Sequence, residues 1–302
     1  MQGGERYNSI SDYLKDEFGT KTVKLSIDAG FTCPNRDGTI AYGGCTFCSA
    51  GGSGELASKG SISKAIQEQI DINEKKWPNA TYIAYFQAHT NTYAPVEVLR
   101  EKYYEAIKNP NISGIVIATR PDCINNDVLA LLEEINQNHF MWIELGLQTI
   151  HEKTSNLLNI GYTLEKYDKA VEELSKRSIK IVTHLILGLP GETYEEMFQS
   201  VNYVCQKPIF GLKLHLLNVV KGSKLYKTNP EYTSFESIDE YVDFVVNLLE
   251  IIPENITIHR LTGDVPRNLL VSPEWSYKKR TILNKINKEL KDRNTFQGRK
   301  CK

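Results

Sequence analysis

The sequence lacks several features that would place it in other classes of protein. No run approaches the roughly 20 apolar residues that a membrane span needs, so we expect no membrane association. The first residues are polar and charged and do not resemble a secretory leader. The G-x-G-x-x-G loop typical of dinucleotide-binding folds is absent. The first two absences predict a cytoplasmic, reducing location, in which a disulfide framework is not expected. The third disfavours a doubly wound open sheet.

Cysteine is also scarce, but three of the six cysteines lie in one loop. Cys33, Cys45 and Cys48 form a C-x11-C-x2-C motif on a Gly-rich loop after a strand-like run at 23–27. Three thiolates from one loop can hold three corners of a [4Fe–4S] cluster and leave the fourth iron open for chemistry. Structural zinc is the alternative, but such sites have four ligands, often as two short pairs. Here only one C-x2-C pair exists, and no histidine lies in the loop.

The other three cysteines are isolated along the chain: Cys123, Cys205 and Cys301. We interpret them as buried or incidental thiols.

Short apolar runs alternate with segments of helical period along most of the chain. Strands are expected at 23–27, 81–86, 114–119, 141–147, 180–187 and 211–217, and helices at 62–75, 96–108, 125–136, 163–176 and 193–205. Units of about 30 residues favour parallel strands with right-handed crossovers. The sequence therefore predicts an α/β fold, a partial (β/α)6 TIM-like barrel over 1–233. An α-rich extension over 234–302, with a helix at 236–251 and a strand at 256–260, should close it. A doubly wound open sheet is the alternative.

The end of this extension is strongly basic. Between 276 and 302, ten Lys or Arg residues stand against Glu289 and Asp292, a net charge of +8 in a chain whose total is −1. Apolar residues at helical spacing predict an amphipathic helix with a basic outer face: Ile282, Leu283, Ile286 and Leu290. A solvated helix and a contact with nucleic-acid phosphates both remain open.

Polar residues near the carboxyl ends of the predicted strands are the candidates for chemistry, because barrel active sites form there. They are Gln87, Arg120, Glu144, Gln148, His184, Lys213 and His215. Glu144 lies in an apolar run, where an unpaired carboxylate would cost several kcal/mol, so we expect an amine or ligand hydroxyl beside it. We interpret His184 and His215 as satisfied core or rim histidines.

Together these motifs resemble the radical S-adenosylmethionine superfamily. The features are the three-cysteine loop with Phe47 before its last cysteine, ELGLQ at 144–148, and the turn GLPGE at 188–192. The wide first cysteine gap departs from the usual C-x3-C-x2-C and is similar to the branch of the Elongator catalytic subunit. Five segments resemble the YtqA/YhcC (MnmL-type) family, from about Phe18 to the basic tail: FGTKTVKLSIDAGFTCPNRDGTIAYGGCTFCSAGGSGE, YFQAHTNTYAP, IATRPDC, IELGLQT and HLILGLPGET.

This resemblance implies two cofactors and a set of residues that hold them. Cys33, Cys45 and Cys48 would ligate a [4Fe–4S] cluster, whose open iron would bind S-adenosylmethionine. The implied cofactor-binding residues are Phe47, Gln87, Glu144, Gln148, Gly188, Pro190 and Gly191. Among them, Glu144 and Gln148 would contact the ribose and adjacent groups, and the turn at 188–191 would approach the adenine. The usual Gly-Gly-Glu after the second strand is replaced here by the segment 87–92.

The resemblance also implies a reaction on tRNA. The wobble uridine would be converted from its 5-carboxymethylaminomethyl(-2-thio) form to its 5-aminomethyl form, with flavodoxin or ferredoxin as the electron donor. The candidate catalytic residues are Arg120, Lys213 and His215, and together with Arg260 they are candidates to pair with the substrate carboxylate. Two other classes stay open: a radical enzyme acting on a small-molecule metabolite, and a non-catalytic metal-bound RNA-binding protein.

Metal analysis after anaerobic purification tests the cysteine motif. We expect a brown protein with about four irons per chain that cleaves S-adenosylmethionine once reduced, because three thiolates leave one iron open. Replacing Cys48 with Ala should remove the iron, whereas Cys205→Ala, which alters an isolated cysteine, should retain it. A colourless protein with one zinc would contradict this interpretation.

Overall fold

The computed structural model describes residues 6–52 and 54–301. Its central feature is an eight-stranded sheet in the order β2-β1-β3-β4-β5-β6-β7-β9, in which every neighbouring pair is parallel. The strands are β1 (Thr22–Asp28), β2 (Ser58–Lys59), β3 (Thr81–Phe86), β4 (Ile112–Thr119), β5 (Phe140–Gln148), β6 (Lys180–Leu187), β7 (Gly211–Leu216) and β9 (Thr257–Arg260). All six predicted barrel strands are present, and the parallel α/β architecture is confirmed.

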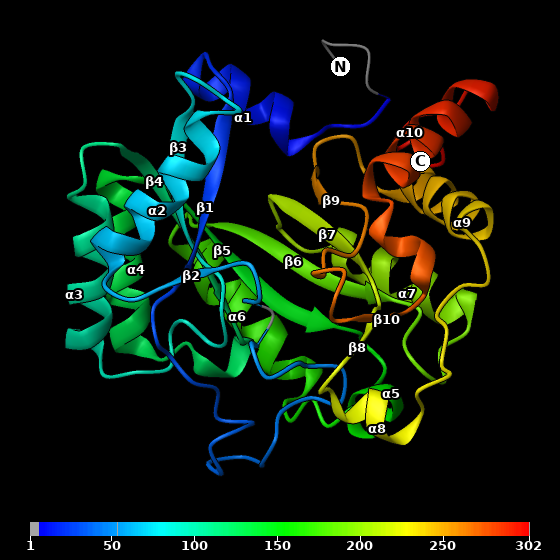
Figure 1. Ribbon diagram of the computed structural model, residues 1–302, viewed down its shortest axis with the longest axis horizontal. Coiled ribbons are helices and arrows are strands. Elements are labelled where there is room, and N and C mark those ends of the chain that lie inside the picture. The colour runs from blue at the N-terminus through cyan, green and yellow to red at the C-terminus, as the bar shows by residue number, and fades with distance from the viewer. Residues whose placement is uncertain (1–5, 53, 302) are drawn as a thin grey trace.

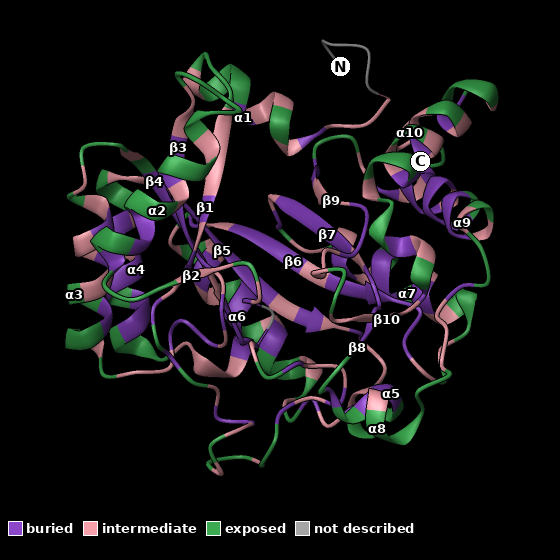
Figure 2. Ribbon diagram, in the orientation of Figure 1, coloured by how far each residue is buried: buried purple, intermediate pink, exposed green. Residues whose placement is uncertain are grey.

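The predicted helices are also present and cover the outer face of the curved sheet (Figure 1). They are α2 (Ile62–Glu74), α3 (Val96–Ile107), α4 (Asn126–Asn138), α6 (Leu164–Lys176) and α7 (Tyr194–Cys205). Their apolar faces and the outward side chains of the strands form the main hydrophobic core. Figure 2 shows the strands largely buried and the outer surfaces of these helices exposed. The result is a partial TIM-like barrel.

The alternation of side chains along each strand separates this core from the inside of the barrel. In β5, Met141, Ile143 and Leu145 belong to the main core, whereas Trp142 belongs to an inner apolar cluster. Glu144 is two residues further along β5 and therefore points to the inner side as well. One strand thus supplies both packing to the helices and a charged group to the interior.

The helix α1 (Ile10–Phe18) fills the floor of the barrel and was not predicted. Its apolar residues pack into the inner cluster with side chains of β3, β4, β5 and β6: Ile10, Tyr13, Leu14 and Phe18. Their helical spacing was a readable signal, as was the N-cap at Ser9, whose side chain accepts from the backbone N–H of Asp12. The helix lies at the gap between the two ends of the sheet (Figure 1), where Ser9 makes a parallel bridge to Ile258 of β9.

The extension contributes β9 to the sheet and two helices, α9 (Ile238–Ile251) and α10 (Lys279–Asp292), as predicted. It also meets the beginning of the described chain, because the backbone N–H of Asn8 donates to Oε1 of Gln297 at 2.8 Å. Smaller elements were not predicted: α5 (Glu152–Leu157), β8 (Val219–Val220), α8 (Lys224–Thr228) and β10 (Leu270–Ser272). In the described part of the chain, no helix combines the length and apolar composition needed to cross a bilayer.

Much of the positive charge counted in the basic tail is paired within the protein. The ion pairs are Lys279–Asp264, Lys285–Asp239, Lys288–Asp292, Arg293–Asp243, Arg293–Glu289 and Lys300–Glu250. Three of these carboxylates, at 239, 243 and 250, belong to α9. The tail therefore presents less uncompensated charge than its sequence indicates, and the phosphate-contact interpretation loses support.

Truncating Leu14 tests the role of α1 in closing the barrel floor. Leu14→Ala should lower the free energy of unfolding by about 2–4 kcal/mol, because it leaves a cavity in the inner apolar cluster. Leu157→Ala is the control, since this leucine is 58% exposed and its loss should change stability by less than about 0.5 kcal/mol. Denaturant titration measures both, and equal losses would contradict a structural role for α1.

Candidate functional site

The three-cysteine loop is fastened to the barrel by two asparagines. Asn35, which is fully buried, donates from Nδ2 to the carbonyl of Asn159 at 2.6 Å and to Sγ of Cys45 at 3.5 Å. Asn159 donates in turn from Nδ2 to the carbonyl of Gly44 at 3.1 Å. These reciprocal bonds hold the loop beside the segment that follows α5. Neither asparagine was predicted, although Asn35 lies inside the cysteine motif.

The thiols of this loop suit a positively charged metal centre. Burial, followed by the neighbouring thiols, raises the pKa of Cys48 to about 12, and burial raises that of Cys45 to about 11. Such thiols stay protonated at neutral pH until a bound metal ion displaces their protons. The guanidinium groups of Arg120 and Arg36 act on Cys45 and Cys48, respectively, in the direction that favours the thiolate. The donor set therefore fits an iron–sulfur cluster.

Within the described residues, no three His, Cys, Asp or Glu side chains converge on a point where a single metal ion could sit. A four-iron cube takes its thiolates at separate corners, so its ligands need not converge in this way.

The eleven-residue gap between the first two cysteines forms a hairpin. Asp37 and Tyr42 make an antiparallel bridge, and the hydroxyl of Thr39 lies 2.8 Å from that of Tyr93 in the loop after β3. Tyr42 is 82% exposed, and its ring packs over Gly38. Gly38 has a φ of +96°, a conformation that residues with a side chain rarely adopt. The wide spacing of the motif thus builds a defined projection beside the cysteines.

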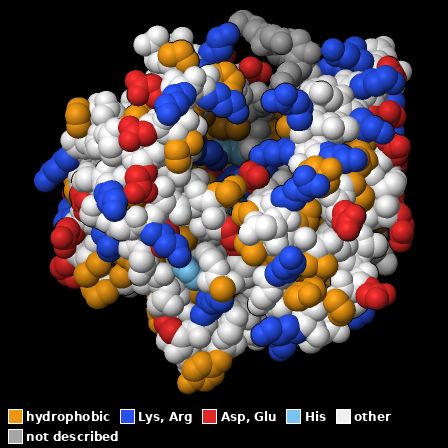
Figure 3. Space-filling view, in the orientation of Figure 1, with side chains coloured by type: hydrophobic (Ala, Val, Ile, Leu, Met, Phe, Trp, Pro, Cys, Tyr) orange, Lys and Arg blue, Asp and Glu red, His pale blue; other side chains and the backbone are white. Residues whose placement is uncertain are grey.

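One cavity at the carboxyl ends of the strands brings most of the predicted site residues together. Its lining includes Cys33, Cys45, Cys48, Phe47, Gln87, Arg120, Glu144, Gln148, Lys213 and His215. The space along this lining amounts to about 1400 Å³, a figure that includes the part open to solvent. Figure 3 shows this face of the molecule hollowed between β1 and β9, with Lys and Arg side chains around the hollow.

The Gly188, Pro190 and Gly191 turn is not part of this lining. Gly188 has a φ of +79°, and a Cβ there would meet Ser234 at 2.5 Å, so the glycine permits close packing against the extension. Its carbonyl accepts a hydrogen bond from the hydroxyl of Tyr232 at 2.9 Å. The contact of this turn with an adenine therefore stays a prediction.

Two residues that line the cavity hold a left-handed backbone conformation without being glycine. They are His89, with a φ of 60°, in the loop after β3, and Gln148, with a φ of 73°, at the end of β5. Non-glycine residues persist in this region only where surrounding structure imposes it, and such residues cluster at functional sites. Both side chains are thereby aimed at the rim of the cavity. His89 belongs to the segment that replaces the usual Gly-Gly-Glu.

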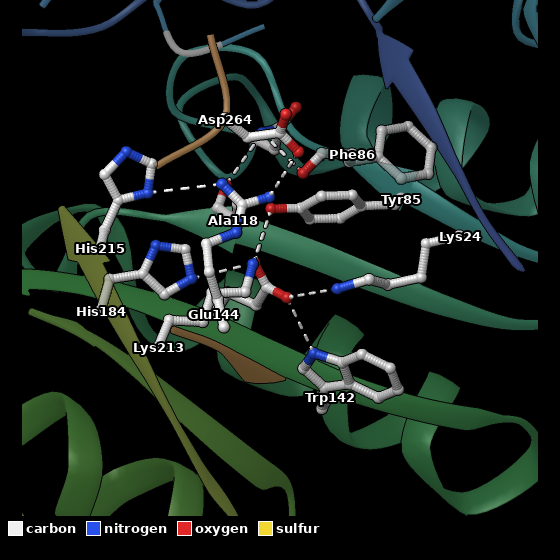
Figure 4. A network of polar contacts seen from close by, with 12 residues as sticks. Lys24, Tyr85, Phe86, Ala118, Trp142, Glu144, His184, Lys213, His215 and Asp264 are labelled. Atoms are coloured by element: carbon white, nitrogen blue, oxygen red, sulfur yellow. Dashed lines mark hydrogen bonds and ion pairs between the residues drawn. The ribbon is translucent and has the colours of Figure 1, made fainter. Parts of the chain in front are cut away.

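Glu144 is the centre of a polar network inside the barrel (Figure 4). Its carboxylate is fully buried and contacts five side chains from β1, β3, β5, β6 and β7: Lys24 at 3.5 Å, Tyr85 at 2.6 Å, Trp142 at 3.2 Å, His184 at 3.0 Å, and Lys213. The prediction that an amine would accompany Glu144 is confirmed. Lys24 and Tyr85 were not predicted, since they lie on strands far from Glu144 in sequence.

This network fixes the charge states of its members. Burial alone would raise the pKa of Glu144, but Lys213, Lys24 and His184 outweigh that effect and hold the pKa well below its ordinary value. Burial, followed by the charge of Lys213, lowers the pKa of His184 to about 4. At neutral pH, His184 is therefore a neutral donor to an ionised Glu144. Since protein groups surround both oxygens of Glu144, its position favours organising the site over contacting a ribose.

Arg120 is held by its own neighbours. Its Nε and Nη2 donate to the two oxygens of Asp122 at 2.9 and 2.8 Å, and its Nη1 donates to the carbonyl of Ile160 at 2.9 Å. The guanidinium also lies 4.7 Å from the ring centroid of Tyr162. With its donors engaged in this way, Arg120 is poorly placed to bind a substrate carboxylate, although its charge acts on the cysteine loop.

Comparison with known proteins places these features in a family. The family profile described as "Radical SAM superfamily" matches residues 33–204, and "Radical_SAM C-terminal domain" matches residues 209–292. Uncharacterized protein YtqA of Bacillus subtilis is 44% identical over 299 residues, covering 98% of this chain and 92% of YtqA. Protein YhcC of Escherichia coli is 36% identical over 296 residues, covering 97% of this chain and 94% of YhcC.

More distant similarities extend to proteins with longer chains. The solved structure of Methanocaldococcus infernus Elp3 superposes with a TM-score of 0.67 at 16% identity, covering 91% of this chain and 64% of that chain, which supports the same fold. A tRNA uridine(34) acetyltransferase of Methanocaldococcus jannaschii is 24% identical over 163 residues, covering 52% of this chain and 29% of that relative.

Replacing Glu144 with Gln tests the network. The variant should lose about 3–5 kcal/mol of unfolding free energy at pH 7, because Lys213 and Lys24 are left without their carboxylate. The folded pKa of Glu144 lies below its ordinary value of 4.5, so the carboxylate stabilises the fold above that pH and ceases to do so as the pH falls through the folded pKa. The difference between wild type and variant should therefore shrink below about pH 4.5.

Denaturant titration at several pH values measures this difference. Glu195→Gln, at an exposed position on α7, is the matched control and should change stability by less than about 0.5 kcal/mol. A Glu144→Gln variant as stable as this control would contradict a central role for the carboxylate.

Proposed function

This chain belongs to the radical SAM superfamily, and from that premise we propose that it modifies the wobble uridine of tRNA. Its cofactors are the [4Fe–4S] cluster and S-adenosylmethionine of that superfamily. The proposed reaction removes the carboxymethyl group from 5-carboxymethylaminomethyl(-2-thio)uridine and leaves the 5-aminomethyl form. The observation that carries the proposal is that one cavity holds both the three cysteine thiols and charged side chains of β5, β7 and β9.

The choice of tRNA rests on the family and its distant relatives. The relative that matches about half of this chain carries the name tRNA uridine(34) acetyltransferase, and uridine 34 is the wobble position. The charged side chains in the cavity lining suit a base with a charged substituent. We also propose that the enzyme works in the cytoplasm, with a flavodoxin or ferredoxin as its reductant.

The chain's own residues divide the work between holding the cofactors and holding the substrate. When bound, the cluster and S-adenosylmethionine supply a 5′-deoxyadenosyl radical able to take a hydrogen atom from an inert C–H bond. Cys33, Cys45 and Cys48 hold the cluster. We propose that Phe47, Gln87 and Gln148 contact S-adenosylmethionine at the rim, and that the Gly188–Gly191 turn supports its adenine from outside the described cavity lining.

The substrate carbon that we propose as the hydrogen donor is the methylene between the amine and the carboxylate. A radical at that carbon is stabilised by both neighbours. We propose that an oxidised iron–sulfur or flavin group accepts one electron from this radical, and loss of the amine proton then gives an imine. Water then cleaves the imine into the aminomethyl uridine and glyoxylate, so that atoms and electrons balance.

Of the three predicted catalytic residues, Lys213 and His215 line the cavity from β7, and Arg120 lies beside the cysteines. We propose that Lys213, held by Glu144 and Tyr85, exchanges protons with the substrate amine. Arg120 acts as a positioning residue, because its donors engage Asp122 and the carbonyl of Ile160.

Nucleoside mass spectrometry of tRNA tests the proposed function. Deletion of the gene should cause 5-carboxymethylaminomethyl uridine to accumulate, because the step that removes the carboxymethyl group is lost. Complementation with wild type or Cys205→Ala should restore the 5-aminomethyl products, whereas Cys48→Ala should not. An unchanged nucleoside profile in the deletion strain would favour a small-molecule substrate instead.

A further inference from the structure

Basic side chains outnumber acidic side chains around β7 and β9. Four cations meet two carboxylates there: Lys24 and Lys213 share Glu144, and Arg260 and Lys279 share Asp264. Burial lowers the pKa of Lys24 and of Lys213, and the charge of Arg260 acts in the same direction. Three of these four cations have side chains less than a quarter exposed, and basic groups gathered in this way favour an anionic ligand.

Arg260 is the cation of this set that keeps donors available. In the described part of the chain its guanidinium makes two polar contacts, and both are long: 3.3 Å from Nη1 to Nδ1 of His215, and 3.7 Å from Nη2 to Asp264. Asp264 pairs more closely with Lys279, at 2.7 Å, than with Arg260. Lys213, by contrast, is directed at Glu144 and the hydroxyl of Tyr85.

The position of Arg260 in the sheet brings it to the cavity. It is the last residue of β9 and is paired in register with Lys213 of β7. Its side chain lines the cavity and is 22% exposed, so a ligand can reach it. Two other guanidinium groups line the cavity. Arg120 directs its donors to Asp122 and to the carbonyl of Ile160, and Arg36 donates to the carbonyl of Ser49 within the cysteine loop.

The neighbours of Arg260 are kept neutral or weakly basic. Burial, followed by the charge of Arg260, lowers the pKa of His215 well below its ordinary value, which leaves Nδ1 of this histidine as an acceptor for the guanidinium. The same charge also acts to lower the pKa of His184 and Lys24. A bound anion would relieve this mutual repulsion.

We propose that Arg260 binds the carboxylate of the carboxymethylaminomethyl group and so determines which modification state of the wobble uridine the enzyme accepts. This inference rests on the proposed function. A guanidinium suits the site because it pairs with a carboxylate through two parallel hydrogen bonds. The 5-aminomethyl product has lost the carboxylate, so its amine is left without the anionic group that Arg260 binds. The same group that selects the substrate therefore favours release of the product.

Binding measurements with two anticodon stem–loop RNAs test this assignment. The RNAs are identical except for the wobble base, which is 5-carboxymethylaminomethyluridine in one and 5-aminomethyluridine in the other. The enzyme carries its cluster and S-adenosylmethionine but receives no reductant, so that no turnover occurs. Wild type should bind the carboxylate-bearing RNA about tenfold or more tightly, the effect of a charge-assisted pair. Arg260→Gln should reduce the preference to about twofold or less.

Two further variants separate recognition from folding. Arg260→Lys retains the charge without the bidentate geometry and should recover part of the preference. Arg267→Gln is the matched control, because Arg267 is an exposed arginine in the segment that follows β9. Its guanidinium lies 4.6 Å from the ring centroid of Tyr277. This variant should keep the full preference. Thermal melts of all the variants establish that they are folded.

The possible outcomes separate the role of Arg260 from the proposed function on which it rests. A wild-type preference that survives in a folded Arg260→Gln variant overturns the role of Arg260 and leaves the proposed function standing. Equal binding of both RNAs by wild type also overturns it, while the tRNA nucleoside profile reports separately on the function. Absence of binding to either RNA, with an unchanged nucleoside profile, overturns both.

Discussion

A carboxylate that is fully removed from water has to be surrounded by donors, and Glu144 meets that requirement with side chains from five strands of the sheet. Two of those donors are lysines, and without Glu144 they would be unpaired cations inside the barrel. The network therefore links these five strands across the inner face and orients the side chain of Lys213. The apolar cluster below it and the cavity above it both depend on this layer.

The cavity joins two halves of different chemistry. On one side, the loop after β1 brings three half-buried thiols beside Arg36 and Arg120, and two asparagines fasten that loop to the segment after α5. On the other, β5, β7 and β9 supply the charged layer. The two halves also pack together, because Cys45 and Phe47 of the cysteine loop contact an apolar cluster that includes Ile186 of β6 and Val219 of β8. The loop is thereby positioned against the strands that border the charged layer.

Periodicity made the fold readable from the sequence, because strands buried on both faces and amphipathic helices differ in their spacing of apolar residues. The cysteine motif was readable because its spacing is local. Long-range pairing was not: the acidic partners of the basic tail lie on α9, and the pairing of Glu144 with Lys24 joins residues 120 positions apart. Arg120 was predicted to meet substrate, yet its main partner is Asp122, two residues along the chain. That pair could have been read from the sequence.

The contact between Asn8 and Gln297 joins residues 289 positions apart, and the bridge from Ser9 to Ile258 spans nearly as many. During synthesis, Asn8, Ser9 and α1 leave the ribosome long before β9 and Gln297. These later elements contact Ser9 and Asn8, respectively. The partners of α1 in the inner apolar cluster are all made by Phe210, so the helix can pack before the sheet is complete. Asn8 and Ser9 gain their long-range contacts only once β9 and Gln297 exist, and until then chaperones that bind unfolded segments can reach them.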